Sequence, residues 1–212
     1  MDIRDSIVGI LAKGSGHKYA GTGFFVSGGL ILTCAHVVDG ARLLKGRVLF
    51  TRVGGDMWLR AKVIFKSDAT ELDIAILKPV DAEDARPNLR LVTSRECGGD
   101  EFVSFGYPLE GSGDGLYGNG KILGERNDSL GRNFLQISSN HITHGFSGCP
   151  VYDEHAGGVV GMVSSGFDFG LDKKLGDIAF AIPSEVLKNA WPELVLDPAE
   201  RTKPKFSLPH QL

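Results

Sequence analysis

Short apolar runs, separated by glycine or charged residues, recur along most of this 212-residue chain. The first half contains SIVGILAKG, GTGFFVSGG, LILTCAHVV, RVLFTRVGG and KVIFKS, and the second half contains EFVSFGYP, GKILGER, NFLQISS, GGVVGMVSSG and DIAFAIP. The runs are rich in Val, Ile, Leu and Phe, and the 29 glycines of the chain supply many turns between them. Many short strands at such spacing are typical of an all-β sandwich or barrel. We therefore expect an all-β fold.

The segment KPVDAEDARPNLR, residues 78–90, interrupts this pattern. It is polar, contains proline and lacks strand periodicity, which is typical of a linker. We expect a first core at residues 1–78, a linker at 79–93 and a second core at 94–183. Helix is scarce: AHVVDG is compatible with one helical turn, and Pro183-Ser184 is a suitable start for a short C-terminal helix at residues 184–191. The proline-spaced residues 192–212 are expected to form an extended tail or linker.

Composition and charge argue against several classes of protein. With 42% hydrophobic and 23% charged residues the chain has an ordinary globular composition. The net charge is −3 and the basic residues are scattered, so we expect no nucleic-acid partner. The N-terminal residues contain no apolar run long enough for a signal peptide or a membrane span, so we expect a cytoplasmic protein without membrane attachment. Three cysteines suit a reducing compartment better than a disulfide framework.

Three residues with possible catalytic chemistry stand at the edges of strand-like runs. Ser147, in NHITHGFSGCPVYD, lies in a glycine-flanked turn that fits a nucleophile or a small turn residue. His36 follows the apolar run LIL, a position that a structural histidine also occupies. Asp73 precedes the buried-strand pattern IAIL, where a surface acid is the ordinary alternative. A buried carboxylate without a partner is costly, so Asp73 must stay solvated or find a hydrogen-bond donor.

Taken together, these residues fit nucleophilic catalysis. A serine nucleophile needs an imidazole to take its proton and a carboxylate to orient that imidazole, and the chain supplies His36, Asp73 and Ser147 in this order. Gly145 permits a backbone conformation that a side chain would hinder. The backbone amides of Gly145 and Ser147 are therefore expected to form the oxyanion hole.

The motifs TCAHVV, LDIAIL, GFSGCPVYD and GMVSSG, in this order, resemble those of trypsin-like (chymotrypsin-fold) serine peptidases, especially bacterial HtrA-type protease domains. The family patterns T-A-A-H, D-I-A-L-L and G-x-S-G-G-P match residues 33–36, 73–77 and 145–150, and FAIPSEVL is similar to the segment that closes the HtrA-type second barrel. No PDZ-like segment follows. The resemblance covers residues 6–190 and implies two antiparallel six-stranded β-barrels with the active site in the cleft between them.

The resemblance also implies roles for single residues. His36 is the general base, Asp73 the orienting acid and Ser147 the nucleophile. The substrate-binding residues that it implies are His141 at the base of the specificity pocket, with Ser164, Ser165 and Gly166 along the substrate backbone and the pocket rim. The implied function is a serine endopeptidase that acts on a protein or peptide substrate and needs no cofactor. His141 and His144 lack a partner at a recognised zinc spacing, so we expect no metal.

The chain departs from the family pattern at three positions near the proposed centre. Cys34 replaces an alanine and Cys149 a glycine; they form either a redox-sensitive pair or, as we prefer, two separately buried small side chains. Phe146 stands where zymogen-type trypsins carry the aspartate that binds a newly cut N-terminus, so we expect no activation by N-terminal trimming. Control would come from loop ordering, with the glycine-rich residues 106–120 as a candidate, or from a partner or a fused domain.

Two other functions are compatible with parts of the pattern. A catalytically silent peptide-binding module could use the same cleft and strand addition, although the complete triad argues against it. An esterase or lipase is disfavoured because its nucleophile-elbow motif needs glycine at position 149, its triad residues follow a different chain order, and α/β alternation is absent.

Overall fold

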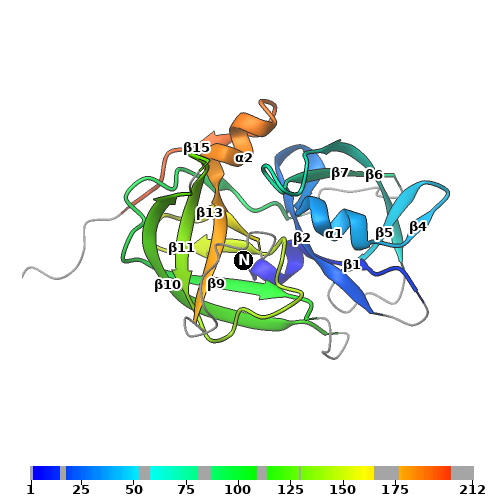
Figure 1. Cartoon of the computed structure of the whole chain (residues 1–212), viewed down its shortest axis with the longest axis horizontal. Coiled ribbons are helices and arrows are strands. Elements are labelled where there is room, and N and C mark those ends of the chain that lie inside the picture. The colour runs from blue at the N-terminus through cyan, green and yellow to red at the C-terminus, as the bar shows by residue number, and fades with distance from the viewer. Residues whose placement is uncertain are drawn as a thin grey trace, which may run out of the picture.

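The computed structural model describes residues 2–14, 18–52, 58–80, 87–108, 114–128, 130–164 and 177–201. Two β-sheets, each closed into a six-stranded antiparallel barrel, lie side by side (Figure 1). The expected all-β, two-barrel fold class is thereby confirmed.

The first barrel has the strand order β1-β2-β3-β7-β6-β5 and closes where β1 pairs with β5. A short hairpin strand, β4, adds to the outside of β5. The strands of this sheet are β1 (Ile7–Leu11), β2 (Tyr19–Val26), β3 (Leu30–Thr33), β4 (Leu43–Leu44), β5 (Arg47–Arg52), β6 (Leu59–Lys66) and β7 (Ala75–Pro79).

The second barrel has the strand order β12-β9-β10-β11-β14-β13 and closes where β12 pairs with β13. Two short strands outside the barrel pair in parallel, β8 with β13 and β15 with β8. The strands of this sheet are β8 (Leu91–Val92), β9 (Glu101–Gly106), β10 (Leu116–Asn127), β11 (Asn133–Ser138), β12 (Pro150–Asp153), β13 (Gly158–Ser164), β14 (Ile178–Pro183) and β15 (Leu196–Asp197).

Among the described residues, four short helices accompany the barrels: η1 (Ile3–Ser6), η2 (Ser27–Gly29), α1 (Ala35–Gly40) and α2 (Ser184–Ala190). The expected turn at AHVVDG is α1, and the expected C-terminal helix is α2, which follows β14 directly and packs against β13 and β14. No helix in the described part of the chain is long and apolar enough to span a membrane.

Part of the glycine-rich segment 106–120, expected to be a loop, is instead a strand. β10 begins at Leu116 and pairs along its first half with β9. The reason is close packing: a Cβ at Gly120 would lie 2.2 Å from the carbonyl oxygen of Ser138, so glycine is needed there for backbone approach rather than for flexibility. Residues 109–113 of the expected loop lie outside the described residues.

Part of the expected C-terminal tail also packs on the second barrel. Leu196 and Asp197 form β15, and Thr93 N donates a hydrogen bond of 2.9 Å to Asp197 O. Arg201 forms an ion pair of 2.8 Å with Asp100 in the turn before β9. Residues 202–212 lie beyond the described part of the chain.

Buried side chains form two clusters. The larger one combines residues of both barrels, including Ile31 and Phe50 from the first and Phe105 and Met162 from the second. The smaller one lies within the second barrel and includes Phe146. The barrels therefore share an apolar core, which fixes their relative position.

Candidate active site

His36 and Asp73 meet through the end of β3 and the turn before β7. His36 lies in the first turn of α1, directly after β3. Asp73 has a φ of 54°, a left-handed conformation that aspartate tolerates better than most residues. Its carbonyl oxygen accepts a hydrogen bond from Ala35 N at 3.2 Å, which holds the turn against α1. The carboxylate then lies 2.8 Å (Oδ2) and 3.0 Å (Oδ1) from His36 Nδ1, and Oδ1 also accepts the His36 backbone N–H at 3.0 Å.

The Asp73 carboxylate is fully buried and has a further partner. Ser164, at the end of β13, donates its hydroxyl hydrogen to Asp73 Oδ2 at 2.6 Å. Burial raises the pKa of the Asp73 carboxyl, but the hydrogen bond and charge of His36 and the Ser164 hydroxyl lower it more, so the net pKa lies below its ordinary value. Asp73 is thus an ionised acceptor that favours the His36 tautomer with hydrogen on Nδ1. The other ring nitrogen, Nε2, is then able to accept a proton.

Ser147 lies in a turn whose two glycines adopt positive φ angles, a backbone conformation that favours glycine. Gly145 and Gly148 have φ values of 102° and 87°. Hydrogen bonds from Phe146 N to Thr143 O (3.1 Å) and from Cys149 N to Phe146 O (2.9 Å) close the turn. The turn and nucleophile interpretations of this stretch are therefore compatible, because the turn determines how the Ser147 side chain is presented.

Thr22, on β2 of the first barrel, holds this turn of the second barrel. Its backbone N–H donates to Ser147 O at 2.9 Å, and its hydroxyl donates to Gly145 O at 2.9 Å. The same hydroxyl oxygen accepts the Tyr107 N–H at 2.9 Å. Thr22 cannot be identified from the sequence, since a threonine in a strand run carries no distinguishing pattern.

Val163, on β13, is hydrogen-bonded both to the Ser147 turn and to Cys34, the residue before α1. Its carbonyl oxygen accepts the Gly148 N–H at 2.8 Å and the Cys34 thiol at 3.3 Å. The structure therefore brings the Ser147 turn, the residue before α1 and the strand that ends at Ser164 to one place. Together with the His36–Asp73 pair, these contacts assemble residues from four separate stretches of the sequence.

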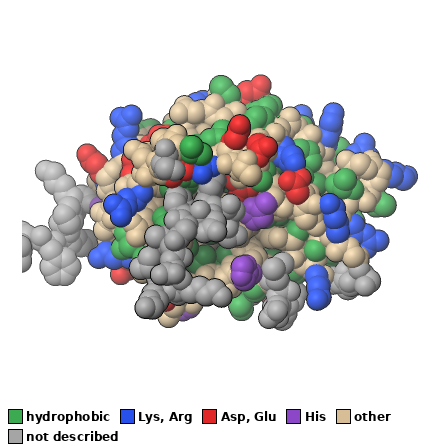
Figure 2. Space-filling model, viewed as in Figure 1, with side chains coloured by type: hydrophobic (Ala, Val, Ile, Leu, Met, Phe, Trp, Pro, Cys, Tyr) green, Lys and Arg blue, Asp and Glu red, His purple; other side chains and the backbone are tan. Residues whose placement is uncertain are grey.

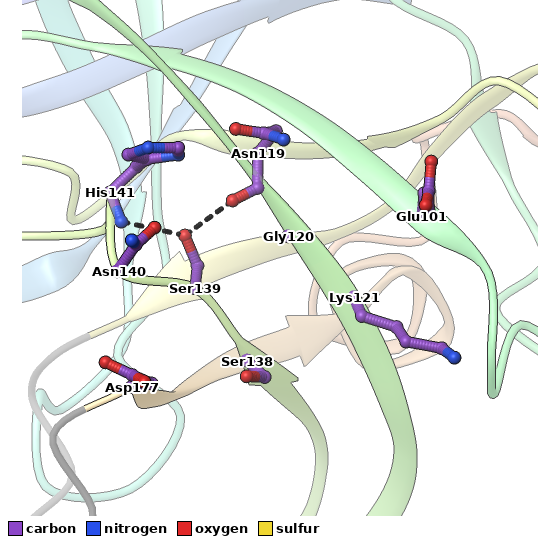
Figure 3. Close-up of a pocket in the computed structure, with 9 residues that line it drawn as sticks. All are labelled: Glu101, Asn119, Gly120, Lys121, Ser138, Ser139, Asn140, His141 and Asp177. Atoms are coloured by element: carbon purple, nitrogen blue, oxygen red, sulfur yellow. Dashed lines mark hydrogen bonds between the residues drawn. The ribbon is translucent and has the colours of Figure 1, made fainter.

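His141 lies beside a polar cavity of about 330 Å³ (Figure 3). Its backbone N–H donates to Ser139 Oγ at 3.1 Å, and that hydroxyl donates to Asn119 O at 2.6 Å. Asp177 and Glu101 also line the cavity. Of the other substrate-binding residues expected from the sequence, Ser164 contacts Asp73, whereas Ser165 and Gly166 lie outside the described residues.

The three cysteines, Cys34, Cys97 and Cys149, are free and buried. Cys34 belongs to the core shared by both barrels and Cys149 to the core of the second barrel, which supports two separately buried thiols rather than a pair. Burial, followed by the charge of Asp73, raises the pKa of the Cys34 thiol well above its ordinary value. Burial raises the pKa of Cys149 to about 12.

Possible metal ligands gather at the same centre. Within the described residues, Cys34 Sγ, a ring nitrogen of His36 and a carboxylate oxygen of Asp73 all lie within 4.8 Å of one another. His141 and His144, the histidines for which the sequence raised a metal site, belong to no such group in this part of the chain.

The face of the molecule shown in Figure 2 carries mixed charges. Lys and Arg side chains are spread around the rim of the face shown in Figure 2, with Asp and Glu side chains between them. This arrangement agrees with the small net charge of −3.

Comparisons with known proteins agree with this fold. Solved structures with similar folds include the inactive form of Rv3671c from M. tuberculosis H37Rv, with a TM-score of 0.67 and 21% identity over 91% of this chain and 87% of that chain. The HtrA-type protease AlgW with a tripeptide gives a TM-score of 0.68 and 22% identity over 88% of this chain and 58% of that chain. No curated protein sequence matches significantly.

At these identities the structural likeness shows the fold alone. The family assignment comes from the sequence model of the trypsin-like peptidase domain, which matches residues 21–162, more than half of the chain. The chain therefore belongs to the family of trypsin-like peptidase domains, the trypsin-like serine proteases.

Proposed function

We propose that this protein is a serine endopeptidase that cuts protein or peptide substrates through an acyl-enzyme. His36 is the general base, Asp73 orients it and Ser147 is the nucleophile. The observation that carries the proposal is the hydrogen bond of 2.8 Å between His36 Nδ1 and the buried Asp73 carboxylate. A glycine-flanked serine turn, held in place by the barrel that carries His36, supports it.

In the acylation step, His36 Nε2 takes the proton of the Ser147 hydroxyl while Oγ forms a bond to the substrate carbonyl carbon. The carbonyl oxygen becomes an oxyanion, which the backbone N–H groups of Gly145 and Ser147 stabilise. His36 then gives the proton to the leaving amine as the C–N bond breaks. Throughout, the ionised Asp73 stabilises the imidazolium that forms on His36.

In the deacylation step, a water molecule takes the place of the amine. His36 accepts its proton as the oxygen attacks the acyl carbon, and the proton passes to Ser147 Oγ when the ester bond breaks. The acid product leaves and the triad returns to its starting protonation state. No cofactor takes part in this cycle.

We further propose that control does not depend on a newly cut N-terminus. Phe146 is buried, and its ring packs closely against Gly106 and Gly118, where an added Cβ would lie 3.1 and 3.0 Å from the ring. An apolar contact, rather than an ion pair, therefore holds the Ser147 turn at this position. Ordering of loops, a partner or a fused domain is the proposed mode of control.

The alternative is a catalytically silent peptide-binding module with the same fold. A fluorophosphonate probe, which reacts with an activated serine, separates the two. We expect the wild-type protein to be labelled, and Ser147→Ala and His36→Ala to lose labelling. Asp73→Asn should react about 10³- to 10⁴-fold more slowly, because its amide favours the wrong imidazole tautomer. Equal labelling of wild type and Ser147→Ala would refute the triad assignment.

A further inference from the structure

We propose that Cys34, His36 and Asp73 form an inhibitory site for a thiophilic divalent cation such as Zn²⁺. The inference rests on the proposed function, since two of the three ligands are triad residues. It adds a form of reversible control that acts directly on the general base.

The three side chains have the right chemistry and nearly the right spacing. Thiolate sulfur, imidazole nitrogen and carboxylate oxygen are the ligands that Zn²⁺ takes in proteins. Their ligand atoms lie within 4.8 Å of one another. In a tetrahedral site such atoms are about 3.4–3.6 Å apart, given metal–ligand bonds of about 2.0–2.3 Å. The His36 Nδ1–Asp73 Oδ2 distance of 2.8 Å must therefore lengthen by about 0.6–0.8 Å, and no separation within the group must shorten by more than about 1.4 Å.

Charge balance favours such a complex in a buried place. Cys34 and Asp73 are fully buried, where an uncompensated charge is costly. A divalent cation bound to one thiolate and one carboxylate makes a neutral unit with the imidazole. Ser164 and the His36 backbone N–H, which already donate to the Asp73 carboxylate, would orient it in the complex as well.

Metal binding would switch off the base by inverting its tautomer. The metal would bind the Nδ1 lone pair. The proton that Nδ1 carried would pass through solvent to Nε2, so the imidazole would stay neutral. Neutral His36 then has no lone pair with which to accept the Ser147 proton. Cys34 loses its thiol proton to solvent, so one proton is released for each cation bound. No oxidation or reduction occurs, and removal of the metal restores the triad.

The exposed face of His36 provides the entry route. The His36 side chain is 32% exposed, whereas Cys34 and Asp73 are fully buried. A rotation of the ring would open a path to the two anionic ligands, and a water molecule from the same side would complete the coordination. Cys34 is decisive because the alanine of the family pattern would leave only two ligands.

Binding is tested first with Co²⁺, whose bond to a thiolate gives a charge-transfer absorption band. The Ser147→Ala protein is titrated, because it keeps all three ligands whether or not the enzyme is active. We expect the band in Ser147→Ala and in wild type, and its loss in Ser147→Ala/Cys34→Ala. Cys97→Ala serves as the matched control, since it removes another buried thiol and should keep the band. Absence of the band in both Ser147→Ala and wild type, or its persistence without Cys34, would overturn the proposal.

Inhibition is tested by the rate of fluorophosphonate labelling. For each variant, the rate with added Zn²⁺ is compared with the rate of the same variant in the presence of a chelator. Zn²⁺ should slow wild type and Cys97→Ala by at least about tenfold. Cys34→Ala should be affected less than about twofold, and Cys34→Ser, which preserves the shape of the site, should bind more weakly than wild type. Equal inhibition of wild type and Cys34→Ala contradicts the assignment. If chelated wild type does not label at all, the proposed function fails, and the cobalt band alone decides the metal site.

Discussion

Asp73 holds a backbone conformation that most residues avoid, at the point where the proposed chemistry needs a fixed carboxylate. Its φ of 54° costs energy, of order 1–3 kcal/mol for a residue other than glycine, although aspartate is among the most tolerant. Hydrogen bonds from His36 and Ser164 to the side chain offset this cost. The sequence pattern alone left a surface acid as the ordinary alternative, because both hydrogen-bond donors come from distant parts of the chain.

The three thiols are expected to be inert in the native protein. Burial raises the pKa of Cys97 and of Cys149 to about 12 and that of Cys34 well above its ordinary value. Because the thiolate is the reactive form, these raised pKa values keep the buried thiols protonated and unreactive near neutral pH. We expect the metal-free native protein to show no rapid reaction with Ellman's reagent, and three thiols to react after unfolding in urea. One rapidly reacting equivalent in the folded protein would contradict this expectation.

At the scale of single elements, the Ser147 turn depends on the close approach of β2. A Cβ at Gly148 would lie 2.0 Å from the carbonyl oxygen of Thr22, and the residue has a φ of 87°. We expect Gly148→Ala to lower the free energy of unfolding by more than about 3 kcal/mol. Gly99→Ala is the matched control, because Gly99 has a φ of 98° but no atom within 4 Å of its Cβ position. It should cost only about 1–2 kcal/mol. Urea denaturation measures both; similar losses would refute the steric argument.

A partly buried carboxylate on helix α2 accepts hydrogen bonds from the two residues that follow β8. Glu185 accepts hydrogen bonds from the Thr93 hydroxyl and from the backbone N–H (3.1 Å) and hydroxyl of Ser94. Burial raises the pKa of Glu185, but the bonds from Ser94 and Thr93 lower it more, to below its ordinary value of 4.5. The depressed pKa means that ionised Glu185 stabilises the fold above pH 4.5, and this contribution is lost as the pH falls through the lowered pKa.

Glu185→Ala tests this link. It should lower the free energy of unfolding by about 1–3 kcal/mol at neutral pH, since the Ser94 donors lose their acceptor. The difference from wild type should shrink as the pH falls below 4.5 and through the lowered pKa, because the wild-type carboxylate is then increasingly protonated. Glu185→Gln, which keeps one acceptor oxygen, should lose less than Glu185→Ala. Urea titrations at several pH values measure the effect; a loss that does not depend on pH would show that the charge contributes nothing.

The strands could be predicted from the sequence wherever an apolar run was long enough to cross a barrel. Runs such as GTGFFV and GGVVGMV became β2 and β13. The two-residue strands β8 and β15 could not be predicted, because their pairing depends on tertiary contact rather than on local pattern. For the candidate site, spacing and motif predict His36, Asp73 and Ser147, whereas the contacts of Thr22 depend on the packing of β2 against the Ser147 turn.

At the scale of the whole molecule, the two barrels share one core and should unfold together. Phe65 of the first barrel packs on Trp191, which follows α2, with ring centroids 5.7 Å apart. Arg132 of the second barrel donates to the Glu71 carbonyl of the first at 2.9 Å. We expect a single urea transition, with coincident midpoints by far-ultraviolet circular dichroism and by tryptophan fluorescence. Two separated transitions would show that the barrels are independent folding units.

Thr22 connects the packing of the two barrels with the proposed activity. Its hydroxyl, on the first barrel, is hydrogen-bonded to the Gly145 carbonyl and to the Tyr107 N–H of the second. Thr22→Val keeps the shape of the side chain but leaves both of these buried groups without their partner. We expect it to lower the free energy of unfolding by about 1–3 kcal/mol.

The same substitution should slow fluorophosphonate labelling of Ser147 by about tenfold or more, because small displacements of a nucleophile and its oxyanion donors are costly. Thr22→Ser is the control that keeps the hydroxyl, and it should label nearly as fast as wild type. A Thr22→Val protein that is less stable but labels at the wild-type rate would mean that the first barrel supports the Ser147 turn without positioning the nucleophile. Loss of both stability and labelling rate in Thr22→Val, but not in Thr22→Ser, would tie the reactivity of the second barrel's serine to one hydroxyl of the first.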